Sequence, residues 1–400
     1  MAERIVVSAM GIISALGTGV TANKDSLRKT RSGLRYPQLL QTAYAREYLM
    51  GEVELSNDDL SEMLGLPMGD NGYTRTTLLA LVAMKELTNG LDRELLEKDL
   101  AFINANTVGG MCSVENMYME FISDKEQGDF TKYIDTLDCA ESTINIANYF
   151  GIKPFMATIS TACSSSANAI LLGSRMIQQG LVKRAICGGC DSLSRFTVNG
   201  FASLKNVSNE DCKPFDQNRT GLNLGEGAGY LLLEKESDAI ARGAEIIAVF
   251  SGYDNSNDAY HPTAPSPDGS AAYRAMERAL KKAKLQAGDI GYINAHGTAT
   301  DTNDAAEGKA IERMFAGKVP FSSTKPFTGH TLAAAGVIEA IFSIWAMQQN
   351  ELLPNLNFET PMESLTIQPV KEKQAKDIQH VLSNSFGFGG NNVSLIFSKA

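Results

Sequence analysis

The stretch ATISTACSSSANAILLGSRMI (residues 157–177) is echoed by PFSSTKPFTGHTLAAAGVIEAI (residues 320–341). Each begins with a short apolar run typical of a β-strand, passes through a turn with reactive polar side chains, and continues into a helix rich in Ala, Ser or Gly. Small side chains let two such helices pack closely at the centre of a molecule, although Ala-rich segments are also simply good helix formers. The echo indicates two similar α/β halves, residues 1–243 and 244–400, joined near Gly243 into one compact unit.

Short β-branched runs alternate with helical patterns along the whole chain. This alternation predicts an α/β fold with largely parallel sheets that helices cover on both faces. The expected strands are residues 4–7, 101–103, 157–160, 184–187, 229–234, 246–251, 292–295, 320–323 and 393–397, and the expected helices are 73–89, 164–179, 270–284, 304–315 and 331–349.

The composition is that of a globular protein with a large core, since 44% of the 400 residues are hydrophobic and 20% are charged. The net charge of -10, with no long block of Lys or Arg, argues against a nucleic-acid partner. The apolar run at 333–347 is too short to span a bilayer and contains Glu339, so no membrane insertion is expected. Six cysteines at irregular spacings suggest a reducing compartment, and we expect a cytoplasmic protein.

Cys163 lies in the turn TACSSS (residues 161–166), between an expected strand and an expected helix. The unpaired N–H groups and the dipole at a helix N-terminus favour an anion there. We therefore expect the pKa of this thiol to fall below its usual value, which would enrich the nucleophilic thiolate. A buried structural cysteine is the alternative on local geometry alone.

Two of the four histidines lie in similar strand-to-helix turns beside glycine: His296 in NAHGTATDTND (residues 294–304) and His330 in KPFTGH (residues 325–330). A single loop histidine is usually ordinary surface, but two such histidines together with Cys163 favour a reactive site. Near the C-terminus, the glycines of NSFGFGGNN (residues 384–392) would let backbone N–H groups approach an oxyanion closely.

These four motifs, in this order and separation, resemble the elongating β-ketoacyl-acyl-carrier-protein synthases of fatty-acid and polyketide assembly. The resemblance covers nearly the whole chain and is strongest from Ile159 onward. It implies a thiolase-like αβαβα fold, in which two similar α/β halves form five layers. It also implies a homodimer, with a heterodimer containing a related subunit as the alternative.

The resemblance further implies a decarboxylative Claisen condensation that yields a 3-oxoacyl-acyl carrier protein. Cys163 would hold the acyl chain as a thioester, and His296 and His330 would each present an N–H to the malonyl thioester oxygen as carbon dioxide leaves. The backbone N–H groups of Cys163 and Phe388 would form the oxyanion hole of the acyl-cysteine. The enzyme would carry no cofactor, because its substrates arrive on the phosphopantetheine of acyl carrier protein.

Further positions match the family in the same way. Lys325 and Glu339 match a charged pair beneath the site, and a carboxylate inside an apolar helix requires a partner in any case. The resemblance assigns Thr298 and Thr300 to the phosphopantetheine arm, Val108 to the acyl tunnel, and Lys132 and Lys205 to the docking of the carrier protein.

Other activities fit the motifs less well. A degradative thiolase needs a second cysteine near the C-terminus, yet none follows Cys212, and initiating synthases pair one His with an Asn. A noncatalytic subunit of a ketosynthase heterodimer would typically lack the nucleophile. From a different class, His296, Asp301, Asp304 and His330 could be the ligands of a metal-dependent hydrolase. A protein that only binds its ligand would form no covalent acyl adduct.

Overall fold

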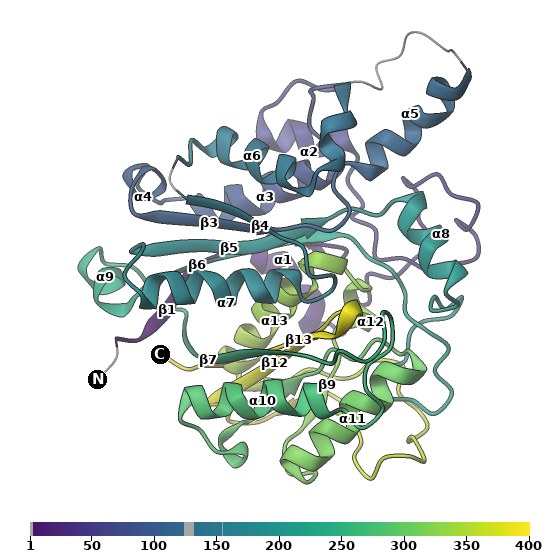
Figure 1. The fold of residues 1–400 in the computed structure, drawn as a ribbon, viewed down its shortest axis with the longest axis vertical. Helices are drawn as coiled ribbons and strands as arrows, with labels where there is room; N and C mark the ends of the chain where they lie inside the picture. The colour runs from purple at the N-terminus through teal and green to yellow at the C-terminus, as the bar shows by residue number, and fades with distance from the viewer. Residues whose placement is uncertain (1–2, 124–131, 154) are drawn as a thin grey trace.

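The structure is a computed structural model that describes residues 3–123, 132–153 and 155–400. Two layers of strands alternate with three layers of helices (Figure 1). The first half supplies five strands in the spatial order β4-β3-β5-β6-β1, and the second supplies β7-β13-β12-β8-β9. The strands of these two sets are β1 (Ile5–Ser14), β3 (Leu100–Ala105), β4 (Phe155–Ile159), β5 (Arg184–Asp191), β6 (Gly227–Lys235), β7 (Ala248–Asn257), β8 (Tyr292–Asn294), β9 (Phe321–Ser322), β12 (His380–Phe386) and β13 (Asn391–Ser398). The two-residue strand β2 (Gly17–Thr18) pairs with β1, and β10 (Glu351–Leu352) pairs with β11 (Gln374–Ala375).

The two sets of strands repeat one topology. In the first, β4, β3 and β5 run parallel, whereas β6 is antiparallel to both β5 and β1. In the second, β9, β8 and β12 run parallel, whereas β13 is antiparallel to both β12 and β7. The prediction of two similar α/β halves is therefore confirmed. The prediction of largely parallel sheets is wrong, because each half ends in antiparallel strands.

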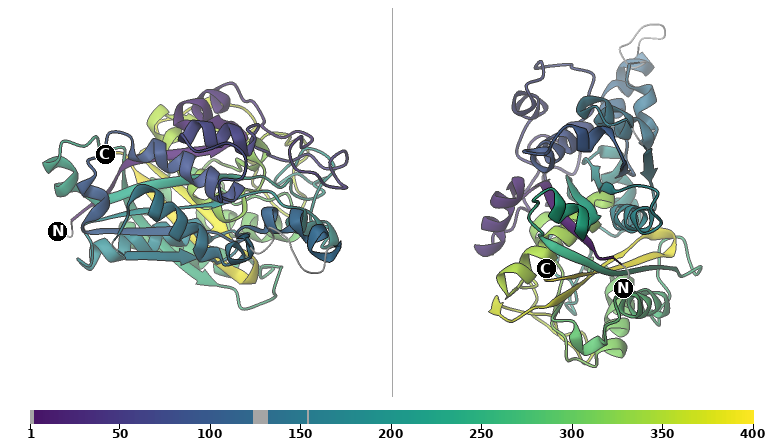
Figure 2. Two further views of the ribbon diagram at one scale, coloured as in Figure 1. Left: turned by 90° about the horizontal axis from the view of Figure 1, so that it is seen from above. Right: turned by 90° about the vertical axis from the view of Figure 1, so that its left-hand side faces the viewer.

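The helices fall into three layers, seen edge-on in Figure 1 and in the right-hand view of Figure 2. α3 and α6 cover the outer face of the first set of strands, α10 and α11 cover the second set, and α7 and α13 lie between the two sets. The helices are α1 (Gly19–Arg28), α2 (Asn57–Leu64), α3 (Arg75–Thr88), α4 (Glu94–Glu97), α5 (Met111–Ser123), α6 (Cys139–Phe150), α7 (Ser165–Gln178), α8 (Arg195–Ser203), α9 (Glu236–Ala241), α10 (Ser270–Ala283), α11 (Asp301–Phe315), α12 (Lys325–Thr328) and α13 (Ala335–Gln349).

The two central helices approach each other closely, as their small residues predict. A Cβ atom added to Gly336 in α13 would lie 2.8 Å from the backbone nitrogen of Ala167 in α7, so no larger side chain fits there. Together with the preceding 3₁₀ turn, α13 forms an 18-residue apolar segment, Leu332–Gln349, that is long enough to cross a membrane. This corrects the expectation that the segment is too short. Since 89% of it is buried inside the fold, it is the core helix that joins both layers of strands.

Candidate active site

Cys163 lies in a strained turn between β4 and α7. Ala162 adopts a left-handed backbone conformation with φ of 52°, which is unfavourable for any residue with a Cβ atom. Ser165 stabilises the turn, because its hydroxyl accepts the N–H of Thr161 at 2.8 Å and donates to the carbonyl of Ala162 at 2.5 Å. Ser164 is the N-cap of α7, so Cys163 does precede a helix N-terminus as predicted.

The thiol of Cys163 nevertheless has a raised pKa, so the expected lowering is wrong. Burial raises this pKa to about 11, because the thiolate would lose its hydration. The positive charge of Lys325 and the backbone N–H groups of Phe388 and Cys163 itself oppose the rise without cancelling it. At neutral pH the side chain of Cys163 is therefore the protonated thiol.

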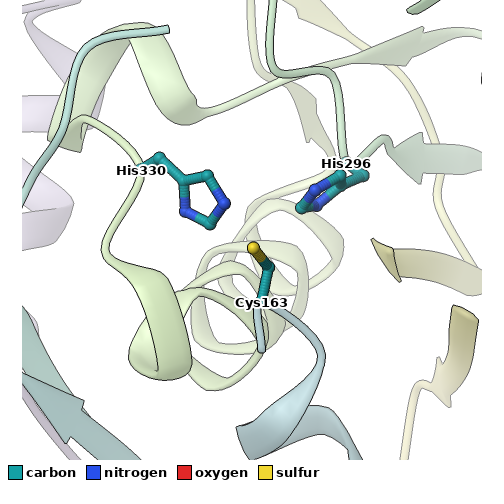
Figure 3. A group of neighbouring side chains, drawn as sticks. All are labelled: Cys163, His296 and His330. Carbon is teal, nitrogen blue, oxygen red and sulfur yellow. The ribbon is translucent and has the colours of Figure 1, made fainter. Parts of the chain in front are cut away.

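His296 and His330 converge on Cys163 from two other strand-to-helix connections. His296 follows β8 and His330 follows α12. The sulfur and one ring nitrogen of each histidine lie within 4.8 Å of one another, and Figure 3 shows both rings directed toward the thiol. The centres of the two imidazole rings are 5.5 Å apart, and the ring planes are nearly perpendicular. The fold thus brings together three side chains separated by up to 167 positions in the sequence.

Hydrogen bonds fix the tautomer of both histidines. Nδ1 of His296 lies 3.2 Å from the ammonium of Lys325, and Nδ1 of His330 accepts the backbone N–H of Leu332 at 3.1 Å. With Nδ1 acting as the acceptor, Nε2 of each ring carries the proton. Burial, reinforced by the charge of Lys325, lowers the pKa of both rings well below its usual value. Both histidines are therefore neutral N–H donors at physiological pH.

Lys325 and Glu339 form a buried ion pair beneath the histidines. The ammonium donates to Oε1 of Glu339 and to the backbone carbonyl of His296, each at 2.5 Å, in addition to its contact with Nδ1 of the same histidine. Burial raises the pKa of Glu339 to about 7 although Lys325 opposes the rise. Three contacts use all three ammonium protons, so Lys325 holds one imidazole ring in place.

Phe388 belongs to the glycine-rich turn between β12 and β13. Its backbone N–H is directed at the sulfur of Cys163, and its ring stacks on Phe201 with the ring centres 5.7 Å apart. A Cβ atom at Gly387 would lie 2.8 Å from the carbonyl oxygen of Thr161 and 3.3 Å from the nitrogen of Cys163. Glycine is therefore required at this position for the turn to approach Cys163.

Two cavities meet at Cys163. The more polar cavity, of about 210 Å³, is lined by both histidines, Thr298 and Thr300 as well as by apolar side chains, and the hydroxyls of the two threonines are hydrogen-bonded at 2.8 Å. A second cavity of about 460 Å³ is lined mainly by apolar side chains, including Val108. Both cavities are lined by Cys163, Phe201, Leu204 and Phe388. Cys163 therefore lies where the more polar cavity joins the apolar one.

The two expected docking lysines have different surroundings. Lys205 is exposed, and its neighbour Leu204 lines both cavities. Lys132 is exposed as well, but its ammonium forms an ion pair with Asp70 at 2.5 Å. Neither lysine itself lines a cavity.

The expected metal ligands do not form a site. The carboxylate of Asp304 accepts the backbone N–H groups of Phe215, Thr298 and Ala299 at 2.7–3.1 Å, and Asp301 is exposed on the first turn of α11. Among the described residues, the group that could hold a metal ion consists of Cys163 and the two histidines, with no carboxylate. Asp304 is thus a buried anchor for the loop that carries Thr298.

Sequence reasoning missed a second anchor, Glu307. Its carboxylate accepts the backbone N–H groups of His296 and Gly297, each at 2.8 Å, and the side-chain amide of Asn384 at 3.1 Å. Burial raises its pKa to about 7. The sequence does contain one indication of this role: Glu307 lies three residues after Asp304 in α11. Residues with this spacing share one face of a helix, so both carboxylates can face the preceding loop.

The sequence matches two domain families that together account for most of the chain. Residues 2–239 match the N-terminal domain of β-ketoacyl synthases, and residues 247–359 match the C-terminal domain. The chain belongs to the β-ketoacyl synthase family. Enzymes of this family are acyltransferases that perform Claisen condensations in chain elongation, and the β-ketoacyl synthase described here has the thiolase-like fold of its relatives.

Relatives of this β-ketoacyl synthase cover its full length. It is 32% identical to 3-oxoacyl-[acyl-carrier-protein] synthase 2 of Staphylococcus aureus (strain COL), over 99% of this chain and 98% of the relative. It is 33% identical, with the same coverage of both chains, to the protein of that name from Synechocystis sp. (strain ATCC 27184 / PCC 6803 / Kazusa).

Solved structures show the same likeness. The ishigamide ketosynthase/chain length factor superposes with a TM-score of 0.92 at 28% identity, with all of both chains covered. The ketosynthase ApeO in complex with its chain length factor ApeC from Xenorhabdus doucetiae superposes with a TM-score of 0.83 at 32% identity, covering 100% of this chain and 98% of that one.

Proposed function

We propose that this β-ketoacyl synthase condenses an acyl group held on Cys163 with malonyl-acyl carrier protein to give 3-oxoacyl-acyl carrier protein, in fatty-acid or related polyene or polyketide elongation. One observation carries the proposal: the thiol and the two neutral Nε2–H groups lie together where a polar passage meets an apolar cavity. The names of the relatives from Staphylococcus aureus and Synechocystis support acyl carrier protein as the substrate carrier.

In the first stage, Cys163 attacks the thioester of an acyl carrier protein. A new C–S bond forms, and the negative charge on the carbonyl oxygen is held by the backbone N–H groups of Cys163 and Phe388. Because the pKa of the thiol is about 11, its proton leaves as the attack proceeds and passes to the departing phosphopantetheine sulfur. The acyl chain then extends into the apolar cavity beside Val108.

In the second stage, a malonyl thioester binds with its carbonyl oxygen between Nε2–H of His296 and Nε2–H of His330. The C–C bond to the carboxylate breaks, carbon dioxide leaves, and the electron pair spreads onto that oxygen, which both N–H groups stabilise. The resulting carbanion attacks the acyl-cysteine carbonyl. Collapse of the tetrahedral intermediate breaks the C–S bond and returns the thiolate of Cys163, which regains its proton from solvent.

The remaining assignments follow from this chemistry. Thr298 and Thr300 would bind the phosphopantetheine arm, because their hydroxyls face the polar cavity. Lys205, and more weakly Lys132, would attract the acidic carrier protein. The enzyme needs no cofactor of its own in this scheme. Residues 1–243 carry the nucleophile and residues 244–400 both histidines, so the two halves form one catalytic unit.

We further propose a cytoplasmic dimer. All six cysteines are unpaired, as expected in a reducing compartment. Phe155 and Met156 on the edge strand β4 are 46% and 41% exposed, which favours a subunit contact along this edge. We take the partner to be a second copy of the chain. The ketosynthase/chain length factor pairs among the relatives make a heterodimer the competing arrangement.

Intact mass spectrometry of the enzyme mixed with acyl carrier protein loaded with different acyl chains tests the proposed function. We expect one acyl group per chain in the wild type and none in Cys163→Ala. An undiminished adduct in the alanine variant would rule out Cys163 as the nucleophile. Comparing condensation across the same panel of acyl chains would identify the preferred substrate.

A further inference from the structure

Asp191, the last residue of β5, is a fully buried carboxylate that the proposed chemistry does not use. It forms no ion pair with any described residue, and four hydrogen bonds satisfy its two oxygens instead. A buried charge without a counterion is costly unless its hydrogen bonds are retained. Burial accordingly raises the pKa of Asp191 to about 6, while these donors oppose the rise.

The four donors come from two different parts of the active site. Oδ1 accepts the backbone N–H groups of Thr107 and Val108, each at 3.0 Å. Oδ2 accepts the hydroxyl of Thr107 at 2.5 Å and the backbone N–H of Ala333 at 2.8 Å. The first segment forms a wall of the apolar cavity, whereas the second immediately follows His330.

The link to Ala333 bears on the orientation of His330. Leu332 directly precedes Ala333 in the chain, and its backbone N–H donates a hydrogen bond to Nδ1 of His330. Leu332 adopts a left-handed conformation with φ of 53°, which is unfavourable for a residue with a Cβ atom. Such a conformation persists only where its neighbours hold it, and the hydrogen bond from Ala333 to Asp191 fixes the very next peptide.

We infer that Asp191 is a positioning residue that joins the wall of the acyl cavity to the turn that orients His330. The carboxylate holds the wall of the acyl cavity and the turn that orients His330 at fixed positions relative to each other. The acyl chain and the Nε2–H group of His330 therefore keep fixed distances from Cys163. The inference rests on the proposed function. It gives a role to Asp191, which takes no direct part in either half-reaction.

Replacement by asparagine should separate the two links. Both donors to Oδ1 are backbone N–H groups, which cannot accept a hydrogen bond. The side-chain oxygen of the asparagine should therefore occupy the position of Oδ1. Its NH₂ group then faces the hydroxyl of Thr107, which can rotate to accept a hydrogen bond, and the N–H of Ala333, which cannot. Asp191→Asn therefore retains the cavity wall and releases only the turn beside His330.

The test compares two half-reactions in the full-length enzyme: formation of the acyl-enzyme by intact mass spectrometry, and release of carbon dioxide from malonyl-acyl carrier protein. In Asp191→Asn we expect acylation and the chain-length profile to stay within about twofold of wild type, and decarboxylation to fall at least tenfold. Thr107→Val is the matched control. It removes the hydroxyl donor from the same oxygen but keeps the bond to Ala333, so it should not reproduce the selective loss of decarboxylation, and any effect should fall on acylation or on the chain-length profile.

Equal losses in both half-reactions of Asp191→Asn, or no loss in either, would overturn the inference. If this variant does not fold, hydrogen exchange in the wild type replaces it: the amide of Ala333 should exchange only on global unfolding, and rapid exchange would refute the link. A wild-type enzyme that neither becomes acylated nor releases carbon dioxide would instead refute the proposed function, and the inference would fall with it.

Discussion

Replacing Lys325 with methionine is expected to destabilise the protein strongly and to disable His296. The ammonium and Oε1 of Glu339 are 2.5 Å apart, and both side chains are almost completely buried. At an effective dielectric constant of ~20, two unit charges at this distance attract by about 7 kcal/mol. Part of this attraction offsets the dehydration of the two ions, and breaking a buried pair from one side costs about 3–5 kcal/mol in practice.

Glu339 makes the cost large because its other oxygen, Oε2, has no hydrogen-bond partner among the described residues. In Lys325→Met the carboxylate would be left without its ammonium partner, so its pKa should rise above the value of about 7 that it has beside the ammonium. Relative to an unfolded chain with an ordinary pKa, a raised folded-state pKa favours folding at low pH and opposes it as the pH rises. The deficit of Lys325→Met should therefore be small near pH 5 and reach about 3–5 kcal/mol at pH 8.

Urea unfolding at pH 5 and pH 8 measures this deficit, with the double variant Lys325→Met/Glu339→Gln as the control. Removing both charges should recover most of the stability lost at pH 8, but not the decarboxylation rate, since Nδ1 of His296 still lacks its donor. An equal loss of stability in Lys325→Met at pH 5 and pH 8, or a double variant no more stable than the single one, would show that the unpaired carboxylate is not the cause.

Three further predictions concern the other parts of the site. His330→Ala should lower the release of carbon dioxide from malonyl-acyl carrier protein about 10²–10³-fold, which is the usual effect of removing one oxyanion donor from an enzyme. Acylation of Cys163, followed by intact mass spectrometry, should stay within a few-fold of wild type. A comparable loss of acylation would contradict the role assigned to His330. Val108→Phe should shift the acyl-chain preference toward shorter chains in a condensation assay by narrowing the apolar cavity, whereas Val108→Ala should not, and an unchanged profile in the phenylalanine variant would place the acyl chain elsewhere. Lys205→Glu should weaken the binding of acyl carrier protein more than Lys132→Glu, because Asp70 already neutralises the charge of Lys132. Titration by fluorescence anisotropy measures both affinities. An unchanged affinity in the double variant Lys132→Glu/Lys205→Glu would show that acyl carrier protein docks elsewhere.

Much of the fold could be predicted because its pattern is local. Short apolar runs bounded by turns locate all nine expected strands, although β1 and β7 extend seven and six residues beyond their expected ends. The five expected helices begin and end within a few residues of their expected bounds. β12 was missed, since the sequence HVLSNSF carries three polar residues that are buried only because β8 and β13 flank the strand. Strand direction was also misjudged: a hydrophobic run shows that a strand is buried but not whether its neighbours run parallel to it.

The local sequence specifies which reactive groups the protein has and predicts that two strand–turn–helix units present them. Cys163, His296 and His330 stand in turns whose chemistry can be understood residue by residue. Their protonation states depend on the folded molecule: burial raises the pKa of the thiol where a helix N-terminus alone would lower it, and Lys325 and Leu332 fix which nitrogen of each histidine carries the proton. Asp304 likewise proved to be a loop anchor, because its oxygens are occupied by backbone N–H groups from positions up to 89 residues away. Such states depend on desolvation and on partners distant in the sequence, and no local pattern contains either.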